Sequence, residues 1–203
     1  MPDLQDRLDT LIADVVVPTL KPRGYRKRRL EWVRVGDTAV HSIALQRSHG
    51  NAPDHLRFYV DVAAYVPAFA RTIGQTVPAD PATATPHYSQ RFESVCDWPA
   101  QWVDLEAWDD ADLHPAFRSA LETLDAHLSA LTTPEALVEV LTSSGAGLDL
   151  DLFAWWCARG DAEGMRQQLA TAHATFGGEE RWPRLRAQFD RVAERFGVGP
   201  LPA

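Results

Sequence analysis

The segment LRFYVDVAAY, residues 56–65, alternates apolar and more polar side chains along its length. A period of two predicts a β-strand that buries one face and exposes the other. This strand therefore puts a sheet with one buried face at the centre of the fold. The apolar face carries every second residue, namely Leu56, Phe58, Val60, Val62 and Ala64.

Two further strands are expected upstream, over residues 25–35 and 38–47. They flank Gly36 and Asp37, and this dipeptide suits a tight hairpin turn because glycine accepts positive φ. Three strands in this order predict an antiparallel meander.

The N-terminal residues 3–17 predict an amphipathic helix with Asp3 as its cap and leucines at helical spacing. Pro18 and Pro22 are expected to end this helix. We expect it to cover the apolar face of the sheet.

The sequence after the meander predicts a loop, then one short strand, then a series of helices. Residues 67–86 contain four prolines and no sustained period, which predicts a surface loop. Residues 92–105 are expected to add one short strand. From residue 109 onward, apolar residues at helical spacing and repeated capping signals predict about five helices, with Gly145 and Gly147 ending one of them.

These patterns predict the α+β class, with an N-terminal helix packed on an antiparallel meander sheet of three or four strands, followed by an all-helical C-terminal subdomain. The expected domains are residues 1–108 for the α+β part and residues 109–203 for a helical subdomain packed on it.

Charge is distributed unevenly along the chain, whose formal net charge is −8. Residues 93–163, the acidic region, carry 2 Lys or Arg against 15 Asp or Glu. Acidic side chains in such a region commonly form the solvent-exposed faces of helices. They can also repel nucleic acid or attract a basic partner. The net charge therefore argues against nucleic acid as the partner.

Membrane and export signals are not evident in the sequence. No apolar run approaches the roughly 20 residues that span a bilayer, and the start MPDLQDRL lacks the pattern of a secretion signal. Cys96 and Cys157 each lie beside tryptophan-containing apolar segments, as reduced packed thiols do. We expect a cytoplasmic protein that does not insert into membranes.

The segment RGYRKRRLEWVR, residues 23–34, concentrates cations in this acidic chain. One interpretation is an edge strand protected against aggregation by charge. A second is an anion site, in which the arginines, Arg29 among them, bind phosphate or carboxylate and Trp32 or Tyr25 stacks on a base. A third is that these cations pair with the acidic region inside the fold.

The end of the second predicted strand gathers polar groups at Gln46, Arg47 and Ser48. Polar residues at a strand end are well placed for binding, or for satisfying the backbone groups of the next loop. His41 and Arg47 share a face of the predicted strand, so an enzyme site for a small anionic substrate is geometrically feasible there.

Signatures of catalysis, metal binding or cofactor binding are missing from the sequence. The seven histidines lack metal-ligand spacing, and Gly147 is followed by Leu148 rather than the lysine of a phosphate loop. We therefore predict no catalytic residue, no metal and no cofactor.

Four segments in order resemble a known bacterial family. They are LKPRGYRKRRLEW at 20–32, ALQRS at 44–48, FYVDVAAYVP at 58–67 and CDWPAQW at 96–102. Over roughly residues 4–108, the chain is similar to the family described as domain of unknown function 4304. That resemblance implies a helix followed by a meander and supplies no activity.

The leading hypothesis is a noncatalytic binding protein that contacts a protein partner through Gln46, Arg47 and the basic strand. One alternative is an immunity or antitoxin-like protein that uses the acidic region against a basic enzyme. The other is an enzyme acting on a small anionic substrate near Arg47, which lacks a candidate base with an orienting partner.

Overall fold

The computed structural model describes residues 3–52, 54–145 and 148–199. The chain forms two compact units. The first joins the described residues up to Val66 with Pro78–Thr132, and the second joins Pro67–Val77 with the described residues from Thr133 onward.

The N-terminal helical segment runs further than the sequence predicts. Helix α1 (Leu4–Leu11), capped by Asp3, continues through a π-helical stretch at residues 12–16 into α2 (Val17–Leu20). The prediction that Pro18 ends the helix is wrong. Proline is tolerated in the first turn of α2, because the wider π-helical stretch before it already interrupts the regular bonding.

The central meander is confirmed. Strands β2 (Glu31–Val35), β3 (Val40–Arg47) and β4 (Arg57–Tyr65) pair antiparallel in sequence order. The turn between β2 and β3 is closed by the Gly36 amide, which donates to the Ala39 carbonyl at 2.9 Å. Gly36 does not adopt the positive φ expected of it.

The sheet has more strands than predicted, because the basic stretch contributes two. Instead of one strand over residues 25–35, the chain forms β1 (Arg26–Arg28) and reverses at Arg29, whose φ is 59°. Arg28 then pairs opposite Glu31. A run of charged residues has no alternation to specify one long strand, so the turn was not visible in the sequence.

Two short strands also pair with β4. They are β5 (Tyr88–Arg91) and β6 (Val103–Asp104), where one returning strand was expected. The strand order is β1-β2-β3-β4-β5, so β1 is an edge of the sheet.

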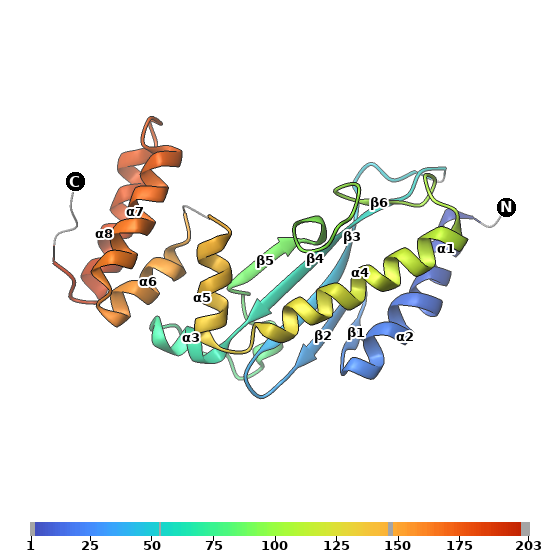
Figure 1. Cartoon of the computed structure of the whole chain (residues 1–203), viewed down its shortest axis with the longest axis horizontal. Helices are drawn as coiled ribbons and strands as arrows, with labels where there is room; N and C mark the ends of the chain where they lie inside the picture. The colour runs from blue at the N-terminus through green and yellow to red at the C-terminus, as the bar shows by residue number, and fades with distance from the viewer. Residues whose placement is uncertain (1–2, 53, 146–147, 200–203) are drawn as a thin grey trace. The chain divides into compact units, whose positions relative to one another are not determined.

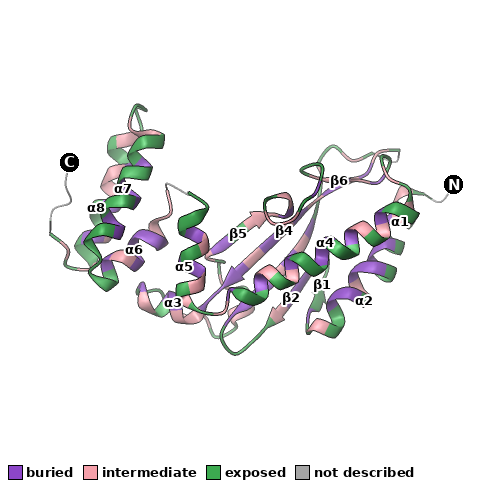
Figure 2. Ribbon diagram, viewed as in Figure 1, coloured by how far each residue is buried: buried purple, intermediate pink, exposed green. Residues whose placement is uncertain are grey.

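Helix α4 (Asp110–Ala130) lies across one face of this sheet beside the N-terminal helical segment (Figure 1). Burial alternates along β4 as the sequence predicts, with Phe58, Val60 and Val62 fully buried (Figure 2). Phe58 meets Phe117 of α4 edge-to-face, with ring centroids 5.9 Å apart. The opposite, helix-free face keeps half-buried positions at the alternate residues of β4.

The second unit is helical. It contains α3 (Pro67–Thr72), α5 (Pro134–Ser143), α6 (Leu150–Arg159), α7 (Ala162–Phe176) and α8 (Trp182–Arg195). The five helices expected after residue 109 are α4 to α8. Helix α3 falls where a loop was predicted, and it forms because Phe69 stacks on Trp155 of α6 with centroids 5.5 Å apart.

Helix α4 belongs to the first compact unit, although the sequence assigns it to the second domain. The domain boundary at residue 109 and the packing of the helical subdomain on the sheet stay predictions. The helix stop expected at Gly147 lies outside the described residues. Among the described residues, no helix has the length and apolarity needed to cross a membrane.

Candidate functional site

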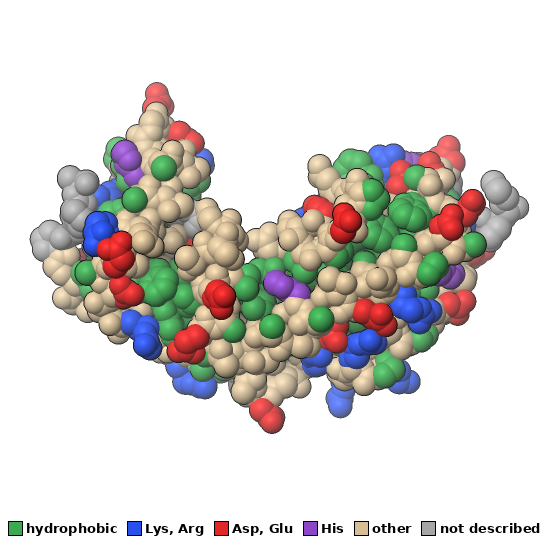
Figure 3. Space-filling view, viewed as in Figure 1, with side chains coloured by type: hydrophobic (Ala, Val, Ile, Leu, Met, Phe, Trp, Pro, Cys, Tyr) green, Lys and Arg blue, Asp and Glu red, His purple; other side chains and the backbone are tan. Residues whose placement is uncertain are grey.

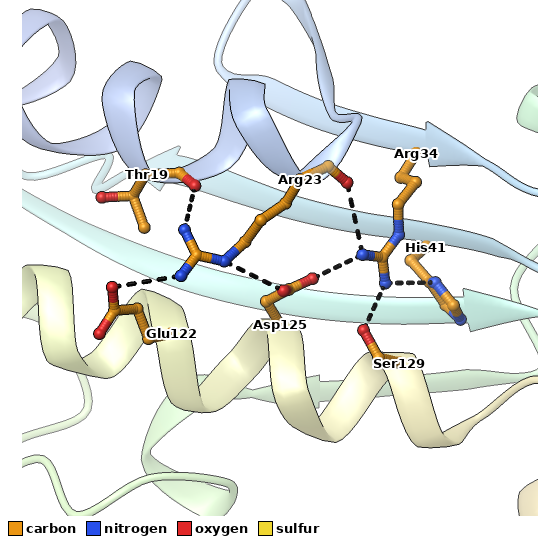
Figure 4. Close-up of polar contacts among 7 residues, drawn as sticks. All are labelled: Thr19, Arg23, Arg34, His41, Glu122, Asp125 and Ser129. Atoms are coloured by element: carbon orange, nitrogen blue, oxygen red, sulfur yellow. Dashed lines mark hydrogen bonds and ion pairs between the residues drawn. The ribbon is translucent and has the colours of Figure 1, made fainter.

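The basic stretch divides into an inner and an outer set of cations. The inner set is Arg23 and Arg34, which meet the acidic side chains of α4 (Figure 4). Arg34 donates to Asp125 at 2.8 Å, and the Arg23 Nε lies 3.3 Å from the other oxygen of that carboxylate. Arg23 also pairs with Glu122 at 3.2 Å. These two cations are therefore neutralised by the acidic region, as the third interpretation of the basic stretch proposed.

His41 of β3 extends this network towards the end of α4. Its Nδ1 lies 3.0 Å from Nη2 of Arg34, and its Nε2 lies 3.2 Å from the Leu131 carbonyl. Because a guanidinium can only donate and a carbonyl can only accept, Nδ1 is the acceptor and Nε2 carries the proton. Burial lowers the pKa of His41, although the bond to Leu131 partly opposes this shift. The neutral ring thus has both nitrogens engaged in structural bonds.

Tyr25 lies under the same network. Its ring is covered by the Arg34 guanidinium at 4.7 Å. Burial raises the pKa of its phenol, and the Arg34 charge opposes that shift. The phenol therefore stays neutral at physiological pH, and Tyr25 acts as a packing surface for Arg34.

Other members of the acidic region also face cations of the first unit. Asp110 pairs with Arg7 at 2.6 Å, and Asp104 pairs with Arg57 at 2.6 Å. On the face drawn in Figure 3, Asp and Glu side chains alternate with Lys and Arg over α4 and the N-terminal helical segment. This surface mixes both signs instead of presenting a single acidic field.

The outer set of cations is Arg26, Lys27, Arg28 and Arg29, which we call the basic edge. All four side chains are exposed. Arg28 reaches Asp80 at 3.9 Å, and both of these side chains are about half exposed. An exposed pair at that distance contributes little stability, roughly 0 to 1 kcal/mol. The basic edge is thus largely left to solvent or to a partner.

A hollow of about 280 Å³ lies beside the basic edge. Its lining combines two arginines with two valines and a glycine, namely Gly24, Arg26, Arg28, Val33 and Val35. Val35 is 54% exposed, and among the described residues it is the one large hydrophobic residue classed as exposed. Cations beside apolar surface suit a ligand that carries a carboxylate or phosphate next to an aliphatic group.

The residues predicted as a site from the sequence do not come together on one surface. Trp32 is 1% exposed and His41 is 4% exposed, and they lie on the helix-covered side of β2 and β3. Arg47 is exposed at the end of β3, about 20 Å along the strand from His41. Gln46 points to the helix-free face beside Tyr59.

The remaining two predicted residues lie in turns. Ser48 accepts a hydrogen bond from the Gly50 amide, as a residue that satisfies a loop backbone does. Arg29 occupies the turn after β1. Arg47 donates to the side chain of Gln5. The binding roles of Gln46, Arg47, Ser48 and Arg29 stay predictions.

Some residues that now matter were not singled out from the sequence. Val33 and Val35 read as ordinary strand residues, and Asp125 as one acid among many. The one available signal for the network was charge complementarity between residues 23–34 and the acidic region. It does not specify which pairs form.

One cluster has the composition of a metal site. Donor atoms of His55, Asp104 and Glu106 lie within 4.8 Å of one another. Each has a partner in the protein, since Asp104 binds Arg57 at 2.6 Å and His55 lies 3.0 Å from Glu106. The adjacent guanidinium disfavours a cation, and these pairs account for the cluster without a metal.

A family model described as Domain of unknown function (DUF4304) matches residues 16–123, just over half of the chain. The chain belongs to the DUF4304 family. The match confirms the resemblance seen in the sequence and extends into α4, so the DUF4304 part includes both the sheet and most of the helix that neutralises Arg23. No curated protein and no solved structure matches the chain.

Proposed function

We propose that this DUF4304 protein is a noncatalytic binding protein that contacts an acidic protein partner through its basic edge. The observation that carries the proposal is the division of the basic stretch. Arg23 and Arg34 form ion pairs with acidic side chains of α4, whereas every residue of β1 is exposed. Solubility alone calls for charge at an edge strand, but it does not call for a hollow with apolar walls beside that charge.

Charge complementarity favours an acidic partner over nucleic acid. The basic edge is short and the chain has a net charge of −8, so a long polyanion would meet repulsion from acidic residues beyond that edge. A short acidic protein segment can touch the basic edge alone. Gln46 and Arg47, also predicted as contacts, would then serve as secondary positions.

The two alternative functions have less support. The immunity-like use of the acidic region requires a single-sign acidic surface, whereas Asp104, Asp110 and Asp125 pair with cations of their own unit. The enzyme hypothesis requires a base near Arg47, whereas both nitrogens of His41 are engaged.

The test is a titration of a fluorescein-labelled peptide rich in Glu and Asp, followed by anisotropy at low and high salt. Reversing two charges of the basic edge, with Arg26→Glu and Lys27→Glu, is expected to weaken binding at least tenfold. The matched control reverses two exposed arginines of α8, with Arg184→Glu and Arg191→Glu, and keeps the same net charge. Equal binding by the two double variants would refute the proposal.

A further inference from the structure

A second hollow lies next to the hollow at the basic edge, on the helix-free face of the sheet. The second has a volume of about 100 Å³, and Val33 lines both. Its floor is formed by strand residues and its wall by residues 81–86, which we call the strap. The lining residues are Glu31, Val33, Val40, Ser42, Ala63, Tyr65, Pro81, Ala82, Ala84 and Pro86.

The two hollows differ in chemistry. The first is lined by the cationic residues Arg26 and Arg28. The second is lined mainly by apolar residues of the strands and of the strap, together with the hydroxyl-bearing residues Ser42 and Tyr65. Its carboxylate, Glu31, is the cross-strand neighbour of Arg28 and so lies towards the cationic side. We call these two adjacent hollows, which share Val33, the groove; Arg26 and Arg28 line one end of it, and mainly apolar residues line the other.

The size of the apolar end restricts its occupant. A hollow of about 100 Å³ is well below the roughly 300 to 1,000 Å³ of pockets that enclose a whole small-molecule ligand, so it suits a small group such as one aliphatic side chain.

We propose that the groove captures the C-terminus of a partner polypeptide, with the terminal carboxylate between Arg26 and Arg28 and an aliphatic side chain under the strap. Arginine binds carboxylates through strong charge-assisted hydrogen bonds, and two arginines line this end of the groove. This inference rests on the proposed binding function and narrows its partner to a chain end that is both anionic and aliphatic.

The strap supplies a competitor for the same site. Asp80 lies one residue before the helical turn at residues 81–83 and reaches Arg28 at 3.9 Å. Its other carboxylate oxygen accepts the Ala82 amide at 3.0 Å. An incoming carboxylate must replace Asp80 at Arg28, and asparagine at this position would keep the cap while removing the competing charge.

The experiment compares two labelled peptides that end in leucine and differ only in a free or an amidated C-terminus. The free acid is expected to bind at least tenfold more tightly. Arg28→Gln should remove that preference, and Asp80→Asn should tighten binding of the free acid severalfold. Ala63→Leu fills the apolar end without touching an arginine and should weaken binding of the free acid about tenfold, with Ala187→Leu on α8 as a size control.

Equal binding of the free acid and the amide would overturn the inference, and so would octanoate binding as tightly as the peptide. The proposed function would still stand if acidic peptides kept their dependence on the basic edge. Circular dichroism and thermal unfolding of Ala63→Leu check that this variant is folded. For Asp80→Asn the expected result is tighter binding of the free-acid peptide, which misfolding cannot produce.

Discussion

Arg34 of β2 and Asp125 of α4, which are 91 residues apart in sequence, join the sheet to its covering helix through an ion pair of 2.8 Å. Their side chains are 21% and 13% exposed, so the pair is shielded from solvent more than a typical surface salt bridge. The same carboxylate serves Arg23. One acid thus holds two cations of the basic stretch at the boundary between sheet and helix.

Replacing Asp125 by alanine is expected to lower the free energy of unfolding by about 2 to 3 kcal/mol. Removing one partner of a fully buried pair costs roughly 3 to 5 kcal/mol, and the remaining access of Arg23 and Arg34 to water reduces that value. Denaturant unfolding followed by circular dichroism measures the difference.

Asp190→Ala is the matched control for Asp125→Ala. Asp190 pairs with Arg186 four residues away on α8, and its side chain is 51% exposed. Its loss should lower the free energy of unfolding by no more than about 0.5 kcal/mol. Equal destabilisation by the two variants would contradict the structural role given to Asp125.

The β-meander could be predicted from the sequence because β4 alternates without a break and Gly36 marks the turn before β3. The split of the basic stretch into two strands could not, because it depends on a left-handed conformation at Arg29. That conformation is uncommon in a non-glycine residue, and no local residue pattern indicates it. Helix α3 was missed because it depends on Phe69 packing against Trp155, a contact that is distant in sequence.

Acidification is expected to destabilise the protein below about pH 6.5, through His41. Burial lowers the pKa of this ring below its usual value of about 6.5, so between the two pKa values the unfolded chain binds more protons. The free energy of unfolding therefore falls as the pH falls, by at most about 1.4 kcal/mol per pH unit for one group. The charged groups that face the ring are Arg34 and Asp125.

The measurement is denaturant unfolding at several pH values between about 7.5 and 5.5, above the range in which most carboxylates titrate. The pKa of His127 is lowered by burial as well, so each histidine is replaced singly by asparagine. His41→Asn should flatten the pH dependence relative to the parent protein. A slope that is unchanged in His41→Asn would show that the ring is not responsible.

Gly164→Ala is expected to destabilise the helical unit by about 1 to 3 kcal/mol, as overpacking does. A Cβ at Gly164 would lie 2.5 Å from the Cδ2 atom of Trp156, which is too close for any side-chain carbon. The control is Gly178→Ala, because a Cβ there meets nothing within 4 Å. Thermal unfolding of both variants should separate them, and similar melting temperatures would contradict the packing described for Trp156.

The candidate site was only half visible in the sequence. The charge of residues 23–34 indicated a contact surface, but the alternation of side chains along a strand does not identify which of the cations contact α4. Sequence neighbours such as Lys27 and Arg28 lie on opposite faces of β1, so the hollow gathers alternate residues from two strands. Such a grouping depends on the register of β1 with β2, which a single sequence does not encode in any local pattern.

The division of the basic stretch into structural and binding cations is tested most directly by two single variants, Arg34→Gln and Arg26→Gln. Each is measured for its free energy of unfolding and for its affinity for the acidic peptide. Arg34→Gln should lose stability and keep its affinity, whereas Arg26→Gln should keep its stability and lose affinity severalfold. Unchanged affinity in Arg26→Gln, or an equal loss of stability in both variants, would contradict the account.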